Sequence, residues 1–134
     1  EYNDPVRQFV SEMLNICVWD FLPFSFLYDL YKSWLKRVSP NSQAVGKTTF
    51  TNELLKLIKD DPTLGWVCDD KQKQVRVGAM MNKAEYLIVQ YDLTQWKNIA
   101  YRGNDLNQIC TPIQNGKYRG IRRVITQPPA QNNP

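Results

Sequence analysis

Two amphipathic helical patterns stand in succession in this chain, and short strand-like runs follow them directly. The first pattern covers Phe24 to Val38, where apolar residues recur at helical spacing and form a wide face. Ser39-Pro40 ends it, because the residue before a proline is disfavoured in helical conformation. The second pattern covers residues 46–59, and its apolar stripe consists of Phe50, Leu54, Leu57 and Ile58. The succession predicts two helices that pack on one core and are joined by a short turn.

The period then changes to that of strands. Residues 64–68 and 74–78 are short strand-like runs, and the charged residues 69–73 between them predict a turn. A hairpin directly after a helix-turn-helix is the layout of a winged helix. We therefore expect an α+β fold: a winged helix-turn-helix with additional helices and a small antiparallel sheet. In this arrangement Lys71 and Lys73 lie at the tip of the wing, and Arg76 lies on its side.

The flanks of this unit set the expected domain bounds. Asp4-Pro5 predicts a helix start, with aspartate as the cap and proline at the first helical position. We expect residues 1–20 to form a lead-in helix from a preceding, absent domain, although packing on this domain is the open alternative. The winged-helix domain is expected over residues 21–126, with an insertion near 83–116. The polar, proline-rich tail at 127–134 is expected to be disordered.

Charge is distributed unevenly along the chain. The whole chain carries a net charge of +4. Residues 1–31 hold five acidic residues and one basic residue, a net of −4, so the remaining 16 basic and 8 acidic residues give +8. The basic part is therefore suited to a polyanion, although basic surfaces are also common where they serve only solubility.

Composition excludes several classes of site. There is no histidine, and the three cysteines, Cys17, Cys68 and Cys110, form no C-x-x-C pair. This excludes the usual zinc-finger site and any histidine-based triad, so we expect neither a metal nor a cofactor. Reduced cysteines, the absence of an apolar run of membrane-spanning length and the absence of a signal peptide favour a cytoplasmic location, with no membrane partner. Glu1 in place of an initiating methionine suggests a fragment of a longer protein.

Two signals that point to enzyme chemistry fail in their context. Gly46-Lys47-Thr48 matches the end of the phosphate-binding loop G-x-x-x-x-G-K-[ST]. The first glycine of that loop would be residue 41, which is Asn41, and the loop must follow a buried strand rather than a helix, so we reject nucleotide binding. Asp60-Asp61 and Asp69-Asp70 stand in polar turns, where adjacent carboxylates are usually solvated, so no catalytic role is expected.

The polar front of the second helix is the first candidate site. Lys47, Thr48, Thr51 and Asn52 lie off its apolar stripe. A helix with its back in a core and such a front can enter the major groove of DNA. A solvated surface helix is the alternative, and on these residues alone it is the more common outcome. Thr48 or Thr49 is expected to cap the helix start, since a hydroxyl there accepts from an unpaired backbone N–H.

The second candidate is the last strand-like run, residues 117–124, which holds four basic residues and no acidic one. We expect Tyr118, Ile121 and Val124 to fix this strand on the sheet. Three of its basic side chains then stay available to a ligand: Arg119, Arg122 and Arg123. Trp66 and Tyr118 can stack on bases where they are exposed, but core positions are expected for both.

The segment from Asp20 to Trp34, which contains LP and FLY-x-x-Y-x-x-W, resembles a segment of phage and plasmid replication proteins. In those proteins it follows a superfamily-3 helicase motor. Gly46 to Phe50 and Tyr118 to Arg122 are similar to the same C-terminal region of phage primase–helicases, so the resemblance covers roughly residues 5–124. It implies a winged-helix accessory domain that contacts DNA or the replication origin in a bacterial host cell, without polymerase or ATPase residues in this fragment. The insertion near 83–116 departs from the pattern and leaves open whether the final strand joins the wing.

The leading hypothesis is a non-catalytic module that binds duplex or forked DNA at an origin or fork. Cations would meet phosphates, and hydroxyls and the amide would read base edges. The expected contacts are Lys47, Thr48, Thr51, Asn52, Lys71, Lys73, Arg76, Lys117, Arg119, Arg122 and Arg123. The alternative is a protein-interaction module that docks on the helicase motor, on a neighbouring subunit of its ring or on another replication protein. An exposed patch of Tyr86, Ile88 and Trp96 would favour this alternative.

Overall fold

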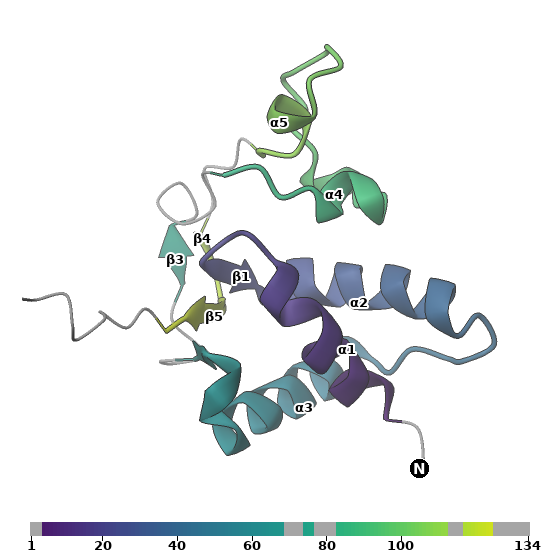
Figure 1. The fold of residues 1–134 in the computed structure, drawn as a ribbon, viewed down its shortest axis with the longest axis vertical. Helices are drawn as coiled ribbons and strands as arrows, with labels where there is room; N and C mark the ends of the chain where they lie inside the picture. The colour runs from purple at the N-terminus through teal and green to yellow at the C-terminus, as the bar shows by residue number, and fades with distance from the viewer. Residues whose placement is uncertain (1–3, 69–73, 77–82, 113–116, 125–134) are drawn as a thin grey trace, which may run out of the picture.

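A computed structural model describes residues 4–68, 74–76, 83–112 and 117–124 of the 134-residue chain (Figure 1). Three helices, α1, α2 and α3, are long enough to carry a core, and the other elements are short. In chain order the elements are α1 (Pro5–Met13), η1 (Leu14–Ile16), β1 (Phe21–Pro23), α2 (Phe24–Val38), α3 (Lys47–Asp60), η2 (Pro62–Leu64), β2 (Trp66–Val67), β3 (Val75–Arg76), α4 (Leu87–Gln90), η4 (Thr94–Trp96), α5 (Leu106–Ile109), β4 (Lys117–Tyr118) and β5 (Gly120–Arg123).

The three long helices pack around a core of aromatic side chains. Asp4 caps α1, because its Oδ1 accepts from the N–H of Arg7 at 3.2 Å. Phe9 of α1 makes edge contacts with Tyr31 of α2 and Phe50 of α3, with ring centroids 5.7 and 5.8 Å apart. The helix expected as a lead-in is therefore part of this core. That another domain precedes it stays a prediction.

A three-stranded antiparallel sheet completes the unit, in the order β1-β5-β2. β5 is the central strand, with Ile121 opposite Leu22 of β1 and Arg122 opposite Val67 of β2. Only glycine fits at position 120, because a Cβ there would lie 2.1 Å from the carbonyl oxygen of Leu22. The final strand thus pairs with β2, the first strand of the predicted wing, and with β1, but not with β3.

The strand pairing differs from the predicted hairpin. β2 pairs with β5, whereas β3 pairs with β4 in a separate two-stranded sheet. The prediction that residues 64–68 pair with residues 74–78 is therefore wrong. Residues 68–119 separate β2 from β5, and a local strand pattern carries no information about a partner so far along the chain. The sequence pattern also misses β1, because all three of its residues are buried and no alternation marks them.

The element order confirms the predicted α+β class, with additional helices and a small antiparallel sheet, and it is compatible with a winged-helix-like fold. The helix predicted from Phe24 to Val38 is confirmed as α2, and the pattern over residues 46–59 corresponds to α3. Within the part of the chain that the structure describes, no helix has the length and apolar content needed to cross a membrane.

The insertion between β2 and β5 packs on α2, on the side away from α3 (Figure 1). Nε1 of Trp96 donates to Oδ2 of Asp29 at 3.0 Å, and Oγ of Ser33 donates to the carbonyl of Tyr91 at 2.7 Å. The Trp96 ring is buried and meets that of Phe26 edge-on at 5.4 Å. The insertion therefore shares the core of the domain.

Candidate nucleic-acid interface

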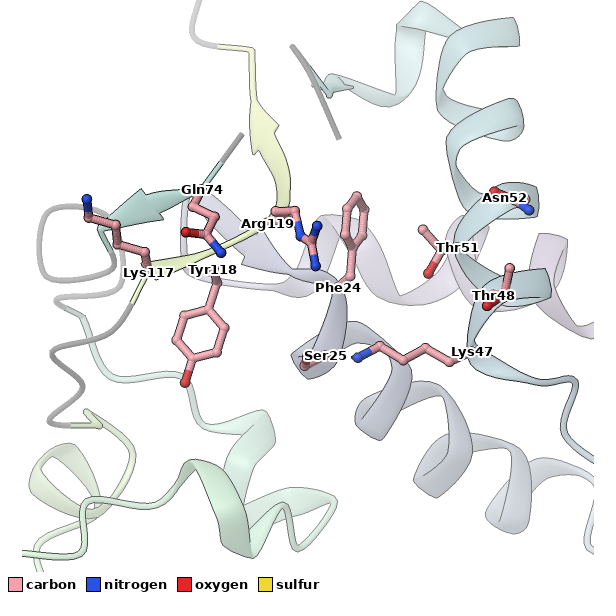
Figure 2. A pocket seen from close by; sticks show the side chains of 10 residues that line it. All are labelled: Phe24, Ser25, Lys47, Thr48, Thr51, Asn52, Gln74, Lys117, Tyr118 and Arg119. Carbon is pink, nitrogen blue, oxygen red and sulfur yellow. Dashed lines mark hydrogen bonds between the residues drawn. The ribbon is translucent and has the colours of Figure 1, made fainter. Parts of the chain in front are cut away.

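The start of α3, the start of α2 and the β4 strand surround an open groove of about 330 Å³ (Figure 2). The lining combines cations, hydroxyls, amides and aromatic rings: Phe24, Ser25, Lys47, Thr48, Thr51, Asn52, Gln74, Lys117, Tyr118 and Arg119. Figure 2 shows the α3 side chains on one side of the groove, Tyr118 and Lys117 on the other, and Phe24 and Ser25 between them. Segments that are far apart in the sequence thus meet in one concave site.

The first turn of α3 forms one side of the groove. Phe50 and Leu54 are fully buried and hold α3 in the core, whereas Lys47 and Thr48 at its start are exposed. Nζ of Lys47 donates to Oγ of Ser25 at 3.0 Å. This bond holds the ammonium group over the floor of the groove.

The predicted cap of α3 is wrong. The helix begins at Lys47, and Gly46 is its N-cap, with extended backbone at φ −68° and ψ 165°. Thr48 and Thr49 lie within the first turn instead, and both are exposed. The helix starts earlier than the threonines predicted because glycine is also tolerated at the N-cap. One consequence is that the Thr48 side chain lines the groove.

β4 and the residue after it form the facing wall. Lys117 is exposed at the start of β4, which its pairing with β3 holds in place. The N–H of Phe24 donates to the carbonyl of Arg119 at 2.9 Å, which ties this wall to the start of α2. The ring of Tyr118 is half-buried and packs against the buried ring of Trp96, with centroids 5.5 Å apart. Both backbone and ring contacts therefore position the wall.

The groove is electrostatically positive. Lys47, Lys117 and Arg119 contribute cations, and none of the described residues that line it is acidic. Exposed charges act over about 8 to 10 Å at physiological ionic strength, so cations around one groove reinforce each other. A concave basic surface raises the local concentration of anions. The arrangement therefore suits a polyanion.

Six of the eleven predicted contact residues line this groove: Lys47, Thr48, Thr51, Asn52, Lys117 and Arg119. Arg122 is exposed on β5 but is not part of the lining. Lys71 and Lys73 fall outside the described residues, and for Arg76 the structure describes the backbone in β3, opposite Lys117. The two candidate regions that the sequence indicated separately are thus brought together.

Arg123, the remaining predicted contact, is engaged within the domain. Its Nε donates to Oδ1 of Asp20 at 3.0 Å, and its Nη2 donates to the carbonyls of Cys17 at 2.7 Å and Trp19 at 3.0 Å. The guanidinium also lies 4.5 Å from the centre of the Trp66 ring. This arginine fastens the segment before β1 to the sheet, so the groove does not include it.

Four lining residues were not among the predicted contacts: Phe24, Ser25, Gln74 and Tyr118. The first two lie in the opening turn of α2, and the sequence does not indicate that β4 passes beside that turn. Tyr118, expected in the core, is half-buried, whereas Trp66 is buried as expected. In the sequence, the one feature that could have placed Tyr118 in the groove was its position between Lys117 and Arg119 on a short strand.

The apolar patch that would have favoured protein interaction is not formed as specified. Ile88 and Trp96 are buried, and Tyr86 alone of the three is exposed, at 48%. The insertion nevertheless exposes other apolar side chains: Val89, Ile99 and Leu106.

No group of three or more potential metal ligands occurs among the described residues. Asp60 and Asp61 are exposed, and Asp61 caps η2, while Asp69-Asp70 lies outside the described part of the chain. Burial raises the pKa of the Cys17 and Cys110 thiols, which keeps them protonated and weakly nucleophilic.

A family model described as Poxvirus D5 protein-like matches residues 1–97 of the chain. The match includes α1, α2, α3 and β2, and therefore the α3 side of the groove. No curated protein and no solved structure matches the chain. The match agrees in broad terms with the resemblance to phage-type primase–helicases and indicates a replication-associated protein of the primase/helicase type.

Proposed function

The chain belongs to the Poxvirus D5 protein-like family, and from this premise we propose that it is a non-catalytic DNA-binding module of a phage-type primase–helicase. In this proposal it is the winged-helix domain that follows a superfamily-3 motor and contacts DNA at an origin or fork. The observation that carries the proposal is the groove between α3 and β4. Its described lining holds three cations, several hydrogen-bonding side chains and no acid.

The residues of the groove divide into two roles. Lys47, Lys117 and Arg119 are suited to phosphate oxygens, because charge-assisted hydrogen bonds to phosphate are strong and independent of sequence. Thr51 and Asn52 project from α3 into the same space and can donate to and accept from base edges. Lys71, Lys73, Arg76 and Arg122 stay predicted as further phosphate contacts.

Fluorescence anisotropy with a labelled forked duplex at rising salt tests this proposal. Each phosphate contact contributes about −0.9 to the log–log salt slope on duplex DNA and about −0.7 on a single strand. The combined substitution Lys47→Ala, Lys117→Ala and Arg119→Ala should therefore weaken binding and flatten the slope by about 2 to 3. A flat slope for the unmodified domain, or no binding at low salt, would refute the proposal.

A matched control removes the same amount of charge elsewhere. Lys36, Lys56 and Lys59 are exposed and do not line the groove. Their combined replacement by alanine should leave the slope within about one unit of the original value, because general electrostatic attraction contributes less than direct contacts. Incubation of the domain with DNA and Mg²⁺, followed by denaturing electrophoresis, tests the non-catalytic part of the proposal, and strand cleavage would contradict it.

A second candidate function is docking on the helicase motor or on a neighbouring subunit of its ring. The observation in its favour is the exposed apolar surface of the insertion, in which Ile99 is 83% and Leu106 is 50% exposed. Sedimentation of the domain with the separate motor domain, in the absence of DNA, tests it. Ile99→Ser with Leu106→Ser should abolish co-sedimentation and leave DNA binding unchanged, and co-sedimentation that survives both changes would count against this surface.

A further inference from the structure

The shape and lining of the groove go beyond general DNA binding and indicate which form of DNA it takes. We propose that the groove holds an unpaired strand, with its backbone along the cations and a base against the ring of Tyr118, rather than the body of a duplex. This inference rests on the proposed function of the same site and specifies its ligand.

The groove confines whatever binds in it. A helix that reads duplex DNA must project into a major groove about 12 Å wide and 8.5 Å deep. The front of α3 instead faces a wall formed by Gln74, Lys117 and Tyr118, with the start of α2 as a floor between them (Figure 2). Pockets of about 300 to 1,000 Å³ hold molecules the size of a few rings. A groove of about 330 Å³ therefore has room for a nucleotide but not for the width of a duplex.

Aromatic rings form part of the lining of the groove. Base-stacking surfaces are typical of sites for single strands, because the faces of paired bases are covered by their neighbours in a duplex. Tyr118 is half-buried, and the buried Trp96 ring supports it at 5.5 Å, so its ring is a fixed platform at the edge of the groove. Phe24 contributes a further, mostly buried ring to the lining, and its N–H donates to the carbonyl of Arg119.

Hydrogen-bonding side chains line the same groove as these rings. The amides of Asn52 and Gln74 and the hydroxyls of Thr48 and Thr51 line the groove. Amides both donate and accept, which matches the Watson–Crick edge of a base, and that edge is available only when the base is unpaired. The three cations supply the backbone contacts that a single strand also needs. Stacking, edge contacts and phosphate contacts are thus present together in one space.

The test compares labelled single-stranded and duplex oligonucleotides of 15 nucleotides, measured by anisotropy at fixed salt. We expect the single strand to bind at least tenfold more tightly than the duplex. Tyr118→Leu should weaken single-strand binding about tenfold, the loss of one stacked base, and should weaken duplex binding less. Tyr118→Phe keeps the ring and should behave like the original protein.

The outcomes separate this inference from the proposed function. Absence of salt-dependent binding to either form refutes DNA binding itself. Binding with a preference for duplex, or an equal loss for both forms in Tyr118→Leu, refutes the single-strand inference alone. Photo-crosslinking of a single strand carrying 5-iododeoxyuridine gives a readout on the unmodified protein, independent of whether the variant folds. Crosslinks should map to Tyr118 or Phe24, and crosslinks found only outside the groove would overturn the inference.

Discussion

Glu85 fastens the insertion to the segment before β1, and its replacement by alanine measures the strength of this link. The side chain is 1% exposed, and its Oε1 accepts from the N–H of Val18 at 2.7 Å and from the N–H of Trp19 at 3.4 Å. Nε1 of Trp19 also donates to the carbonyl of Lys83 at 2.7 Å. Glu85→Ala removes the carboxylate and leaves this last bond in place.

The magnitude follows from the two orphaned donors. A buried N–H that loses its acceptor costs about 1 to 3 kcal/mol, and the longer bond to Trp19 contributes the smaller share. The substitution also removes a carboxyl group whose burial raises its pKa, and this relief offsets part of the loss. We expect a net loss of about 2 kcal/mol in the free energy of unfolding. For a chain of this size that lowers the Tm by about 8 °C.

Unfolding in guanidinium, followed by tryptophan emission, measures this loss, because all four tryptophans are buried: Trp19, Trp34, Trp66 and Trp96. Amide hydrogen exchange at Val18 and Trp19 should accelerate in Glu85→Ala and gives a local readout. Glu85→Gln is the matched control, since its amide oxygen keeps the acceptor, and we expect it within about 1 kcal/mol of the original protein. An alanine variant with unchanged stability, or unchanged exchange at Val18, would refute the reasoning.

Three further predictions rest on single positions. Burial raises the pKa of Glu85 above its ordinary value of 4.5, so the stability it contributes is present below that unfolded value and is lost as pH rises through the folded pKa. Denaturant titrations from the unfolded pKa up to the folded pKa should therefore show Glu85→Gln gaining stability relative to the original protein as pH rises. A difference in the free energy of unfolding that stays constant with pH would contradict this. Arg123→Met should lower the free energy of unfolding in urea by about 2 to 4 kcal/mol, because two backbone carbonyls lose their donor. A loss under about 0.5 kcal/mol would count against the role given to Arg123. Gly120→Ala should lower the Tm by at least about 8 °C, because its Cβ would meet the Leu22 carbonyl. Gly46→Ala is the control, since its Cβ meets nothing within 4 Å and the Tm should change little. Equal melting curves for the two variants would show that the contact at Gly120 does not limit stability.

The helical part of the fold could be predicted because its signals are local. The apolar face of α2 and the stop at Ser39-Pro40 lie within one stretch of sequence, and the predicted bounds agree with the structure. The sheet could not be predicted in the same way. β2 and β3 have two residues each, which is too short for an alternating pattern, and β2 meets its partner β5 only across residues 68–119. Pairing at this range depends on the tertiary packing of the whole domain.

The candidate site could likewise be predicted where its signals are local, but not where it depends on long-range packing. The α3 residues follow from helical periodicity, and composition singles out the basic run at residues 117–124. That these two regions face each other depends on the close approach of β1 and β5 at Gly120, which the sequence does not reveal. The alternation of β5 puts Arg122 on the face opposite Ile121 and Arg123, but the partners that hold Arg123 come from a segment about 100 residues earlier, which the sequence does not reveal.

The segment between β2 and β5, which includes β3 and β4, gives the groove its second wall. Without β3 and β4, the front of α3 would stand open to solvent, which is the geometry suited to a duplex major groove. Here Tyr118 stands on Trp96, and Trp96 is fixed to α2 through Asp29 and Phe26. The wall is thus positioned by contacts within the core. The α3 side lies inside the family match and the β4 side lies beyond it, at residues 117–118. Changes in β4 can therefore alter the ligand of the groove without disturbing the packing of the helix-turn-helix.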